Sequence, residues 1–270
     1  IVSSNISLAS CLYDESFEFK NAFSSLSPII FMILIIINVH QIRFSKSSLA
    51  WSSSKIAKVN EKTINLIIKI EAVIWFLTIL LNRIFVTYND VVVEARDGYT
   101  WLNLFPNTFC GLCSLVLSLT VIFGKKDNFI FHSLGYLGLV GGVVTMIYPD
   151  FLDSQAFVDP RSITGLLHHT FMAGVMIKVL IFGGMKPSIS KWSYFILGLC
   201  VVTTIGVIEL DAFDFKKAMQ INQPLISSLP VLTSWYIVYL VMIIAHFIFL
   251  VLYEKFKNER TLKEIFAKLK

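Results

Sequence analysis

The sequence predicts an all-α, polytopic membrane helix bundle with seven transmembrane helices. Two observations lead to this fold class. Of the 270 residues, 56% are hydrophobic and only 15% are charged, and the mean hydropathy is +0.72, which excludes an ordinary soluble globular domain. The hydrophobic residues also gather in runs of about 20, the length that an α-helix needs to cross a bilayer. We therefore treat residues 1–270 as a single integral membrane domain.

The first predicted span covers residues 22–39. The segment before it is mixed and acidic and lacks the basic stretch and cleavage site of a signal peptide, so none is predicted. The second span covers about residues 63–86 and contains Lys69 and Glu71. Residues two apart do not face each other on a helix. We expect Lys69 to extend toward the interface, and Glu71 either to find a partner on another helix or to be protonated.

Five more spans follow, separated by short connections. They cover about residues 101–124, 128–148, 162–183, 192–210 and 231–252. The basic tail, residues 253–270, spaces hydrophobic residues among lysines, which is typical of an amphipathic interfacial helix. Lys178 lies within the fifth of the seven spans and is also expected to extend toward the interface.

The distribution of basic residues predicts the orientation of the chain. The connections after spans one, three and five, together with the tail, hold 15 lysines and arginines, whereas the opposite side holds 6. By the positive-inside rule, the amino terminus lies outside and the carboxyl terminus inside. Because topology accounts for the positive charge, we do not infer nucleic-acid binding; membrane lipid is the expected partner. No internal repeat of the kind found in inverted-repeat transporters is evident.

Polar residues in the third and fifth spans are the candidates for a functional site. Cys110 lies roughly 13 Å along the third span, and His169 lies roughly 12 Å beyond Arg161 along the fifth. Both spans run from outside to inside in the predicted orientation, so the thiol and the imidazole are expected to meet in the outer leaflet. An imidazole within hydrogen-bond reach of a thiol favours the nucleophilic thiolate. This pairing suits acyl transfer through a thioester.

Two neighbours of this pair leave alternatives open. His168 is rotated by about 100° from His169, so only one of the two is expected to point directly at the thiol, and we favour His169. Cys113 shares the face of Cys110 in a C-x-x-C spacing, which occurs in redox and metal sites. No second ligand pair follows, so neither a metal nor a cofactor is predicted. The structural alternative is that Cys110 is a small packing residue and His169 a hydrogen-bonding residue between helices.

Other polar residues extend the candidate site toward the substrate. Pro106 is expected to kink the third span and help open a cavity. Asn107 and Thr108 then become candidate donors to an oxyanion or an ester carbonyl, with hydrogen bonds to neighbouring helices as the alternative. Arg83, near the outer end of the second span, is a candidate for contact with a lipid phosphate, with a role as an interfacial anchor as the alternative.

Four short motifs resemble a known family. They are FPNTFC (105–110), GYLGLVGGVVTMIYPDFL (135–152), ITGLLHHTFMAG (163–174) and QPLISSLPVLTSWYI (223–237). In this order and spacing they resemble the YwaF-like family of bacterial multi-pass membrane proteins, which is related to a eukaryotic transmembrane acyltransferase that remodels ether phospholipids. The resemblance implies an acyl-accepting Cys110 and a basic His169 that act on phospholipid in the cell membrane. The chain has Thr108 where the family pattern L-P-L-H-L-C has histidine.

Two functional hypotheses of different classes follow. In the first, a Cys/His cavity open to lipid performs acyl transfer. In the second, the protein is a transporter or a non-enzymatic membrane subunit of a larger complex, and the same polar residues bind a ligand or hold helices together. A transporter is expected to carry charged residues near the midplane of several spans. Glu71 is the one acid that fits this description, which argues against the transporter.

Overall fold

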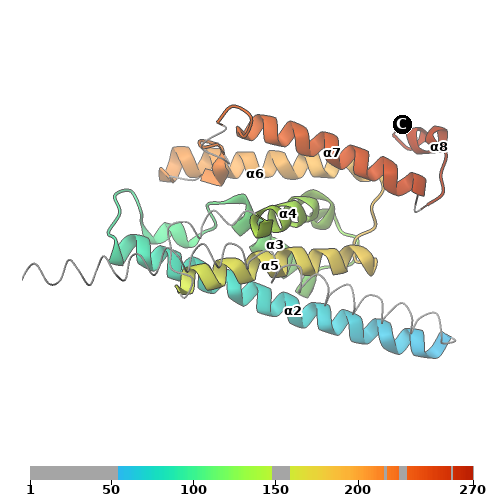
Figure 1. The fold of residues 1–270 in the computed structure, drawn as a ribbon, viewed down its shortest axis with the longest axis horizontal. Helices are drawn as coiled ribbons and strands as arrows, with labels where there is room; N and C mark the ends of the chain where they lie inside the picture. Colours follow the sequence, from blue (N-terminus) through green and yellow to red (C-terminus); the bar gives the residue numbers. More distant parts are fainter. Residues whose placement is uncertain (1–53, 148–158, 216–217, 225–229, 257, 270) are drawn as a thin grey trace, which may run out of the picture.

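The structure of the protein is a computed structural model that describes residues 54–147, 159–215, 218–224, 230–256 and 258–269 (Figure 1). Within these ranges all regular secondary structure is helical. Five helices there are long and apolar enough to cross a membrane, which confirms the prediction of an all-α membrane bundle at this level. The first predicted span, residues 22–39, lies outside the described residues.

Six long helices make up the bundle in the described part of the chain. They are α2 (Ser54–Tyr88), α3 (Phe109–Phe123), α4 (Phe129–Ile147), α5 (Pro160–Ile181), α6 (Trp192–Phe213) and α7 (Trp235–Phe256). The short segments are the π-helical η1 (Asn89–Val93), the 3-10 turns η2 (Trp101–Leu104), η4 (Ile189–Lys191) and η5 (Ala218–Gln220), and the final helix α8 (Leu262–Ala267). Predicted spans two and four to seven each coincide with one long helix, although α2 begins earlier than hydropathy indicates.

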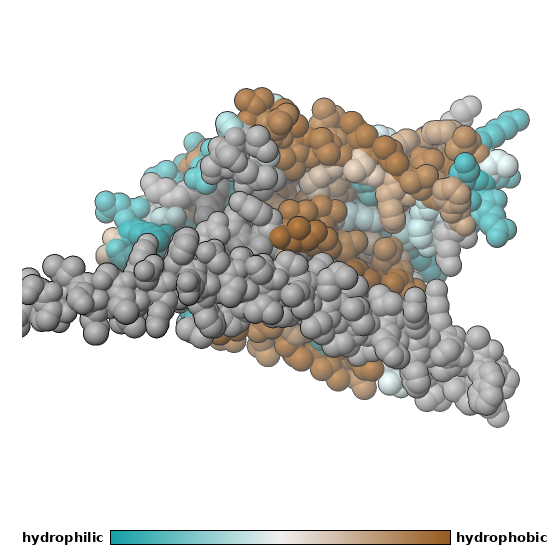
Figure 2. Space-filling view, viewed as in Figure 1, coloured by the Kyte–Doolittle hydropathy of each residue, from teal (hydrophilic) through white to brown (hydrophobic). Residues whose placement is uncertain are grey.

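The long helices lie roughly side by side and follow one another across the bundle (Figure 1). α7 packs on α6, α6 packs on α4, and α4 contacts both α3 and α5, which in turn contact α2. Large hydrophobic side chains are exposed along α2, α6 and α7. Figure 2 shows hydrophobic residues along the length of the molecule and hydrophilic residues gathered toward its two ends. An apolar surface of this extent is the surface that a bilayer covers.

Glycines let α4 approach its neighbours closely. At Gly142, an added Cβ would lie 2.9 Å from the amide nitrogen of Ala173 and 3.0 Å from the carbonyl oxygen of His169, both on α5. At Gly198 of α6, an added Cβ would lie 2.2 Å from the carbonyl oxygen of Ser133 on α4. Helix association in lipid depends on such close packing, since lipid tails already solvate apolar side chains. These contacts set the spacing of α4 from α5 and α6.

The predicted third span, residues 101–124, is wrong at its amino-terminal end. The chain forms η2 and then non-helical backbone around Pro106, and α3 begins only at Phe109. Proline disfavours a helical conformation in the residue before it. Thr108 then acts as the N-cap, with its hydroxyl oxygen accepting a hydrogen bond from the Gly111 amide at 3.2 Å, which stabilises the later start. The 15 residues of α3 extend about 22 Å, less than the hydrocarbon core of a bilayer.

Lys178 does not extend to the interface as predicted. Its ammonium nitrogen lies 2.5 Å from Glu71 Oε1, so the two side chains form an ion pair between α5 and α2. Their side chains are only 8% and 22% exposed. Charged groups inside a membrane bundle are costly unless they are paired. The pair therefore confirms the expectation that Glu71 has a partner on another helix.

Asp127 joins two connections at the end of the bundle where α3 finishes. Its carboxylate lies 2.6 Å from Lys191 Nζ and 2.7 Å from His132 Nε2, and it accepts a hydrogen bond from the Lys186 amide at 2.8 Å. Burial raises the pKa of Asp127, but the hydrogen bonds from Lys191, Lys186 and His132 outweigh burial and lower that pKa overall. The α3–α4 connection is thereby held against the segment between α5 and α6.

Glu254, at the same end of the bundle, holds the tail in place. Its carboxylate is fully buried and lies 2.5 Å from Arg260 Nη1 and 3.0 Å from Lys268 Nζ. It also accepts a hydrogen bond from the Ser188 hydroxyl at 3.1 Å. The predicted amphipathic tail thus contains a short helix, α8. The ion pairs with Glu254 and the buried side chain of Ile265 hold it against the bundle.

Replacing Gly198 with alanine is expected to lower the melting temperature of the purified protein. The added methyl group would meet the backbone of Ser133, so α6 has to move away from α4, and overpacking of this kind costs about 1–3 kcal/mol. Thermal unfolding in detergent measures the effect. Val201→Ala, at a position 44% exposed on the same helix, is the control, and equal melting temperatures for the two variants would contradict the packing argument.

Replacing Asp127 with asparagine is expected to destabilise the protein at pH 7 but not in acid. Folding lowers the pKa of this carboxyl below its ordinary value of 3.8, so its stabilisation is present above that value and disappears as the pH falls through the folded pKa. The difference in melting temperature between wild type and Asp127→Asn should therefore shrink below about pH 4. Asp97→Asn, in the exposed η1–η2 connection, is the control. An equal difference in melting temperature at pH 7 and in acid would refute an ionic origin of the stabilisation.

Candidate functional site

One cavity collects the six residues that the sequence analysis selected. It has a volume of about 290 Å³ and lies at the end of the bundle where α2 finishes and where α3 and α5 begin. Its lining includes all six of them, namely Arg83, Asn107, Thr108, Cys110, His168 and His169. They come from α2, from the segment before α3, and from α3 and α5 themselves. Cys110 of α3 and His169 of α5 therefore line one cavity, whereas their meeting in the outer leaflet and the roles of the six residues stay predictions.

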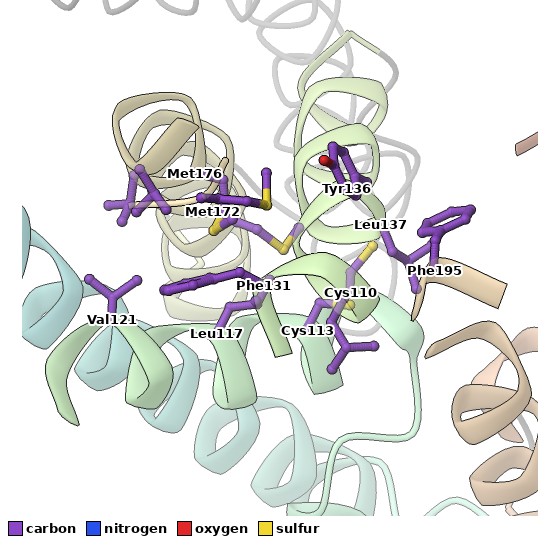
Figure 3. Close-up of a cluster of buried hydrophobic side chains, with 14 of the residues drawn as sticks. Cys110, Cys113, Leu117, Val121, Phe131, Tyr136, Leu137, Met172, Met176 and Phe195 are labelled. Carbon is purple, nitrogen blue, oxygen red and sulfur yellow. The ribbon is translucent and has the colours of Figure 1, made fainter. Parts of the chain in front are cut away.

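The Cys110 thiol lies in the first turn of α3, since the helix begins at Phe109. The first turn of a helix carries unpaired amides and the positive end of the helix dipole, and both favour a thiolate over a thiol. Gly141 of α4 leaves room for the sulfur, because an added Cβ there would lie 3.1 Å from Cys110 Sγ. Figure 3 shows Cys110 and Cys113 within the cluster of buried hydrophobic side chains. Cys113 is fully buried, whereas Cys110 is 9% exposed and lines the cavity.

His169 is held in one tautomer by the backbone of its own helix. Its Nδ1 lies 2.8 Å from the carbonyl oxygen of Gly165. A carbonyl oxygen only accepts, so Nδ1 carries the proton, and Nε2 of the neutral ring is left as a hydrogen-bond acceptor. The ring is buried and lines the cavity. His169 therefore has the protonation pattern of a general base.

His168 shares the cavity with His169 instead of pointing elsewhere. The centroids of the two rings are 3.9 Å apart and their planes are tilted by 36°. Nδ1 of His168 lies 3.1 Å from the hydroxyl oxygen of Ser114 on α3, and this hydroxyl also lies 3.3 Å from Met172 Sδ. The single hydroxyl proton of Ser114 can go to only one of these two partners, and its choice sets the tautomer of His168.

Arg83 supports the non-helical backbone ahead of α3. Its Nη2 donates to the carbonyl oxygens of Asn103 and Phe105, the latter at 3.1 Å. Carbonyls outside a helix find no water in a bilayer and need a partner in the protein. Arg83 is only 9% exposed, so it is not the interfacial anchor that was the alternative for this residue. The guanidinium also lines the cavity, which leaves its predicted contact with a lipid phosphate open.

Two more arginines border the mouth of the cavity. Arg96 lies 3.2 Å from Asp90 and 2.5 Å from Glu94, and Arg161 lies 2.6 Å from Asp159 and 3.6 Å from Glu94. The hydrogen bonds from Arg161 are the main cause of a lowered pKa of Asp159. The sequence pattern did not select Arg96, Asp90 or Arg161, because charged residues next to a span are expected from topology alone. Their proximity to a buried thiol is visible only after folding.

The predictions of no metal and no cofactor remain predictions. Among the described residues, no group of three or more His, Cys, Asp or Glu side chains is arranged to hold a metal ion. The chemistry that the lining offers is a thiol, two imidazoles, several neutral amide and hydroxyl side chains that include Asn107 and Thr108, the carboxylate of Asp90, and guanidinium groups. A nucleophile, a base and cationic groups around one cavity are the parts that acyl transfer requires.

Comparison with protein families identifies the family of this chain. The model of the TMEM164 family matches residues 17–253. The chain belongs to the TMEM164 family. Neither a curated protein nor a solved structure matches it. Membership and the apolar helices together establish that this TMEM164-family chain is a multi-pass membrane protein. The matched region contains every residue that lines the cavity, and the finer expectation of a YwaF-like, bacterial relative stays a prediction.

Cys110 is expected to react with a small maleimide several-fold faster than Cys113. Cys110 borders the cavity and lies in the first turn of α3, whereas Cys113 has no exposed surface. Peptide mass spectrometry after timed labelling of the TMEM164-family protein in detergent measures both rates, and the Cys113→Ala variant assigns the signal to Cys110. Faster labelling at Cys113 would show that the cavity does not admit reagents to the Cys110 thiol.

Proposed function

We propose that this protein is a thioester-forming acyltransferase that acts on membrane phospholipid, with Cys110 as the acyl acceptor. The observation that carries the proposal is the shared cavity, in which a thiol in the first turn of α3 is grouped with the two imidazoles of α5. A buried thiol by itself has many explanations. Its location at a helix amino terminus, in one cavity with a histidine of the correct tautomer, favours nucleophilic catalysis.

In this proposal the chain crosses the cell membrane seven times, with its amino terminus outside and its carboxyl terminus inside. The cavity then opens toward the outer leaflet. The charges of the described residues support this orientation, since Lys125, Lys126, Lys186 and Lys191 lie between helices at the end opposite the cavity. Basic residues concentrate on the cytoplasmic side of membrane proteins.

The first half-reaction transfers an acyl group from a donor lipid to the protein. The Cys110 sulfur attacks the ester carbonyl of the donor, and its proton passes to Nε2 of His169, which the hydrogen bond to Gly165 leaves as an acceptor. The carbon–oxygen bond of the ester breaks as the thioester forms. The imidazolium returns its proton to the leaving alkoxide, so a lysophospholipid departs and His169 is neutral again.

In the second half-reaction the thioester is the acyl donor and a lysophospholipid is the acceptor. A hydroxyl group of an acceptor lysophospholipid gives its proton to Nε2 of His169 as its oxygen attacks the thioester. The new ester forms, Cys110 leaves as a thiolate, and the imidazolium returns the proton to sulfur. His168, whose ring lies against that of His169 and is bonded to Ser114, fixes the position of the base ring and is the second candidate for its role.

The remaining lining residues support a lipid substrate. Asn107 and Thr108 lie three and two residues before the nucleophile and are the donors that we assign to the developing oxyanion. The guanidinium of Arg83 is assigned to the phosphate of the headgroup. A volume of about 290 Å³ suits the ester and the glycerol region but not two acyl chains, so the chains remain in the bilayer, against the apolar outside of the bundle.

Replacing Cys110 with serine is expected to abolish acyl transfer, because a serine hydroxyl lacks the acidity of the thiol. The measurement is transfer of a radiolabelled acyl chain from phospholipid to lysophospholipid in vesicles that contain the purified protein, together with an acyl adduct on the protein that hydroxylamine removes. Cys200→Ser, at an exposed cysteine on α6, is the matched control. Full transfer by Cys110→Ser would contradict the proposal, and lipid binding without an adduct in the wild type would favour a non-enzymatic ligand-binding role.

Replacing His169 with asparagine is expected to slow transfer by about 10²- to 10⁴-fold, the usual contribution of a general base. The same assay with His168→Asn decides which imidazole acts. A larger loss with His168→Asn would reverse the assignment of the two rings. Unchanged rates with both variants would exclude base catalysis by this pair.

A further inference from the structure

A second cavity lies at the other end of α3. It has a volume of about 300 Å³ and is lined by α2, by the end of α3 and the connection to α4, and by the end of α5. Gly124, on its wall, follows Cys110 by 14 residues, or about 21 Å along a helix. The two cavities share no lining residue. The second cavity therefore belongs to a different site from the proposed catalytic one.

The walls of this second cavity divide into a cationic rim and an apolar floor. Lys69, Lys125 and Lys126 form the rim, and we call the site the lysine cavity. The floor includes Val121 and Phe131, which are only 7% and 4% exposed and lie next to each other at the edge of the buried cluster in Figure 3. A rim of ammonium groups above an apolar floor is complementary to an amphiphile with an anionic head and a hydrocarbon chain.

The charge of the rim is only weakly balanced within the protein. Lys126 lies 3.0 Å from Glu61, but both side chains are more than half exposed, and exposed pairs of this kind contribute little. No carboxylate among the described residues forms a salt bridge with Lys69 or Lys125. The next acid along α2, Glu71, is paired with Lys178 on α5. The lysine cavity thus keeps an excess of positive charge that a bound anion would neutralise.

The depth of the lysine cavity matches the headgroup region of a bilayer. Its rim lies where α3 and α5 end and α4 begins, so the apolar part of the bundle stops at this level. α2 continues past it toward Ser54 and carries Lys69 on the part of the helix that flanks the cavity. Lipid phosphates lie at this boundary, and lysines near it are attracted to anionic lipids.

We propose that the lysine cavity binds the phosphate headgroup of an anionic phospholipid from the leaflet opposite the Cys110 cavity, with the start of one acyl chain on the floor formed by Val121 and Phe131. The bound lipid bridges α2 and the α3–α4 connection. This inference does not depend on the acyltransferase proposal, because it involves other residues and the other end of the bundle.

The test measures lipid binding to the full chain in nanodiscs of phosphatidylcholine that contain increasing amounts of phosphatidylglycerol. Native mass spectrometry reports retained phosphatidylglycerol, and thermal unfolding reports its stabilising effect. The Lys69→Gln/Lys125→Gln double variant is expected to bind phosphatidylglycerol about 30-fold more weakly, the effect of removing two lysines near an anionic surface. Lys255→Gln/Lys263→Gln, with the same charge change at exposed positions of α7 and α8, should bind as the wild type does.

Any of the following results would overturn the proposal. Equal losses in the two double variants would reduce the effect to general surface charge, and equal binding by the wild type and Lys69→Gln/Lys125→Gln would exclude the site. Stabilisation of the wild type by inorganic phosphate in pure phosphatidylcholine, to the same degree as by phosphatidylglycerol, would assign the cavity to a free anion. Melting temperatures in pure phosphatidylcholine check that both double variants are folded.

A photoreactive phosphatidylglycerol provides a second measurement that does not need a variant. With a diazirine near the headgroup, it should label the peptides that contain Thr120–Phe131 or Val179–Gly184, which line the lysine cavity. Labelling confined to α6 and α7, which do not line it, would contradict the proposal even if binding were tight.

Discussion

The structure depends on how backbone carbonyls are satisfied where the chain enters the membrane ahead of α3. A bilayer offers no water to non-helical backbone, so the carbonyls of Asn103 and Phe105 need donors from the protein. The guanidinium of Arg83 on α2 supplies them. Because this stretch is supported, α3 can begin as late as Phe109, and the thiol of Cys110 falls in a first helical turn that borders a polar cavity. A continuous helix from residue 101 would have put that thiol in mid-helix, without the helix amino terminus beside it.

The glycines of α4 provide a second constraint. They let α4 pack closely against α5 and still leave space for the Cys110 thiol. Gly142 brings α4 against the backbone of His169 and Ala173, whereas Gly141 leaves room for Cys110 Sγ. One helix thus fixes the separation of the nucleophile-bearing α3 from the histidine-bearing α5. Both histidine rings line the cavity, 3.9 Å apart and tilted by 36°, although an ideal helix separates adjacent residues by about 100°.

The two ends of the bundle differ in how their charged side chains are paired. Near the Cys110 cavity, Arg96 and Arg161 are paired with carboxylates, whereas Arg83 donates to backbone carbonyls and keeps its charge. Between the two ends, Lys178 and Glu71 neutralise each other and join α5 to α2. At the far end, two carboxylates organise the connections and the tail, while the lysine cavity retains unbalanced positive charge. The proposed acyl transfer and the proposed lipid site therefore belong to chemically distinct ends of one bundle.

The hydropathy and length of the apolar runs were enough to predict a helical membrane protein. Each spanning helix needs about 20 apolar residues in a row, and this can be judged from each segment alone. Depth along two parallel spans also sufficed to expect Cys110 near His169, because helical rise is constant. The Arg83 carbonyl contacts and the Lys178–Glu71 pair were decided only by tertiary structure. Each joins polar groups that lie 20 to more than 100 positions apart in the sequence. The sequence shows that a polar group within an apolar span needs a partner, but only the folded bundle shows which residue that partner is.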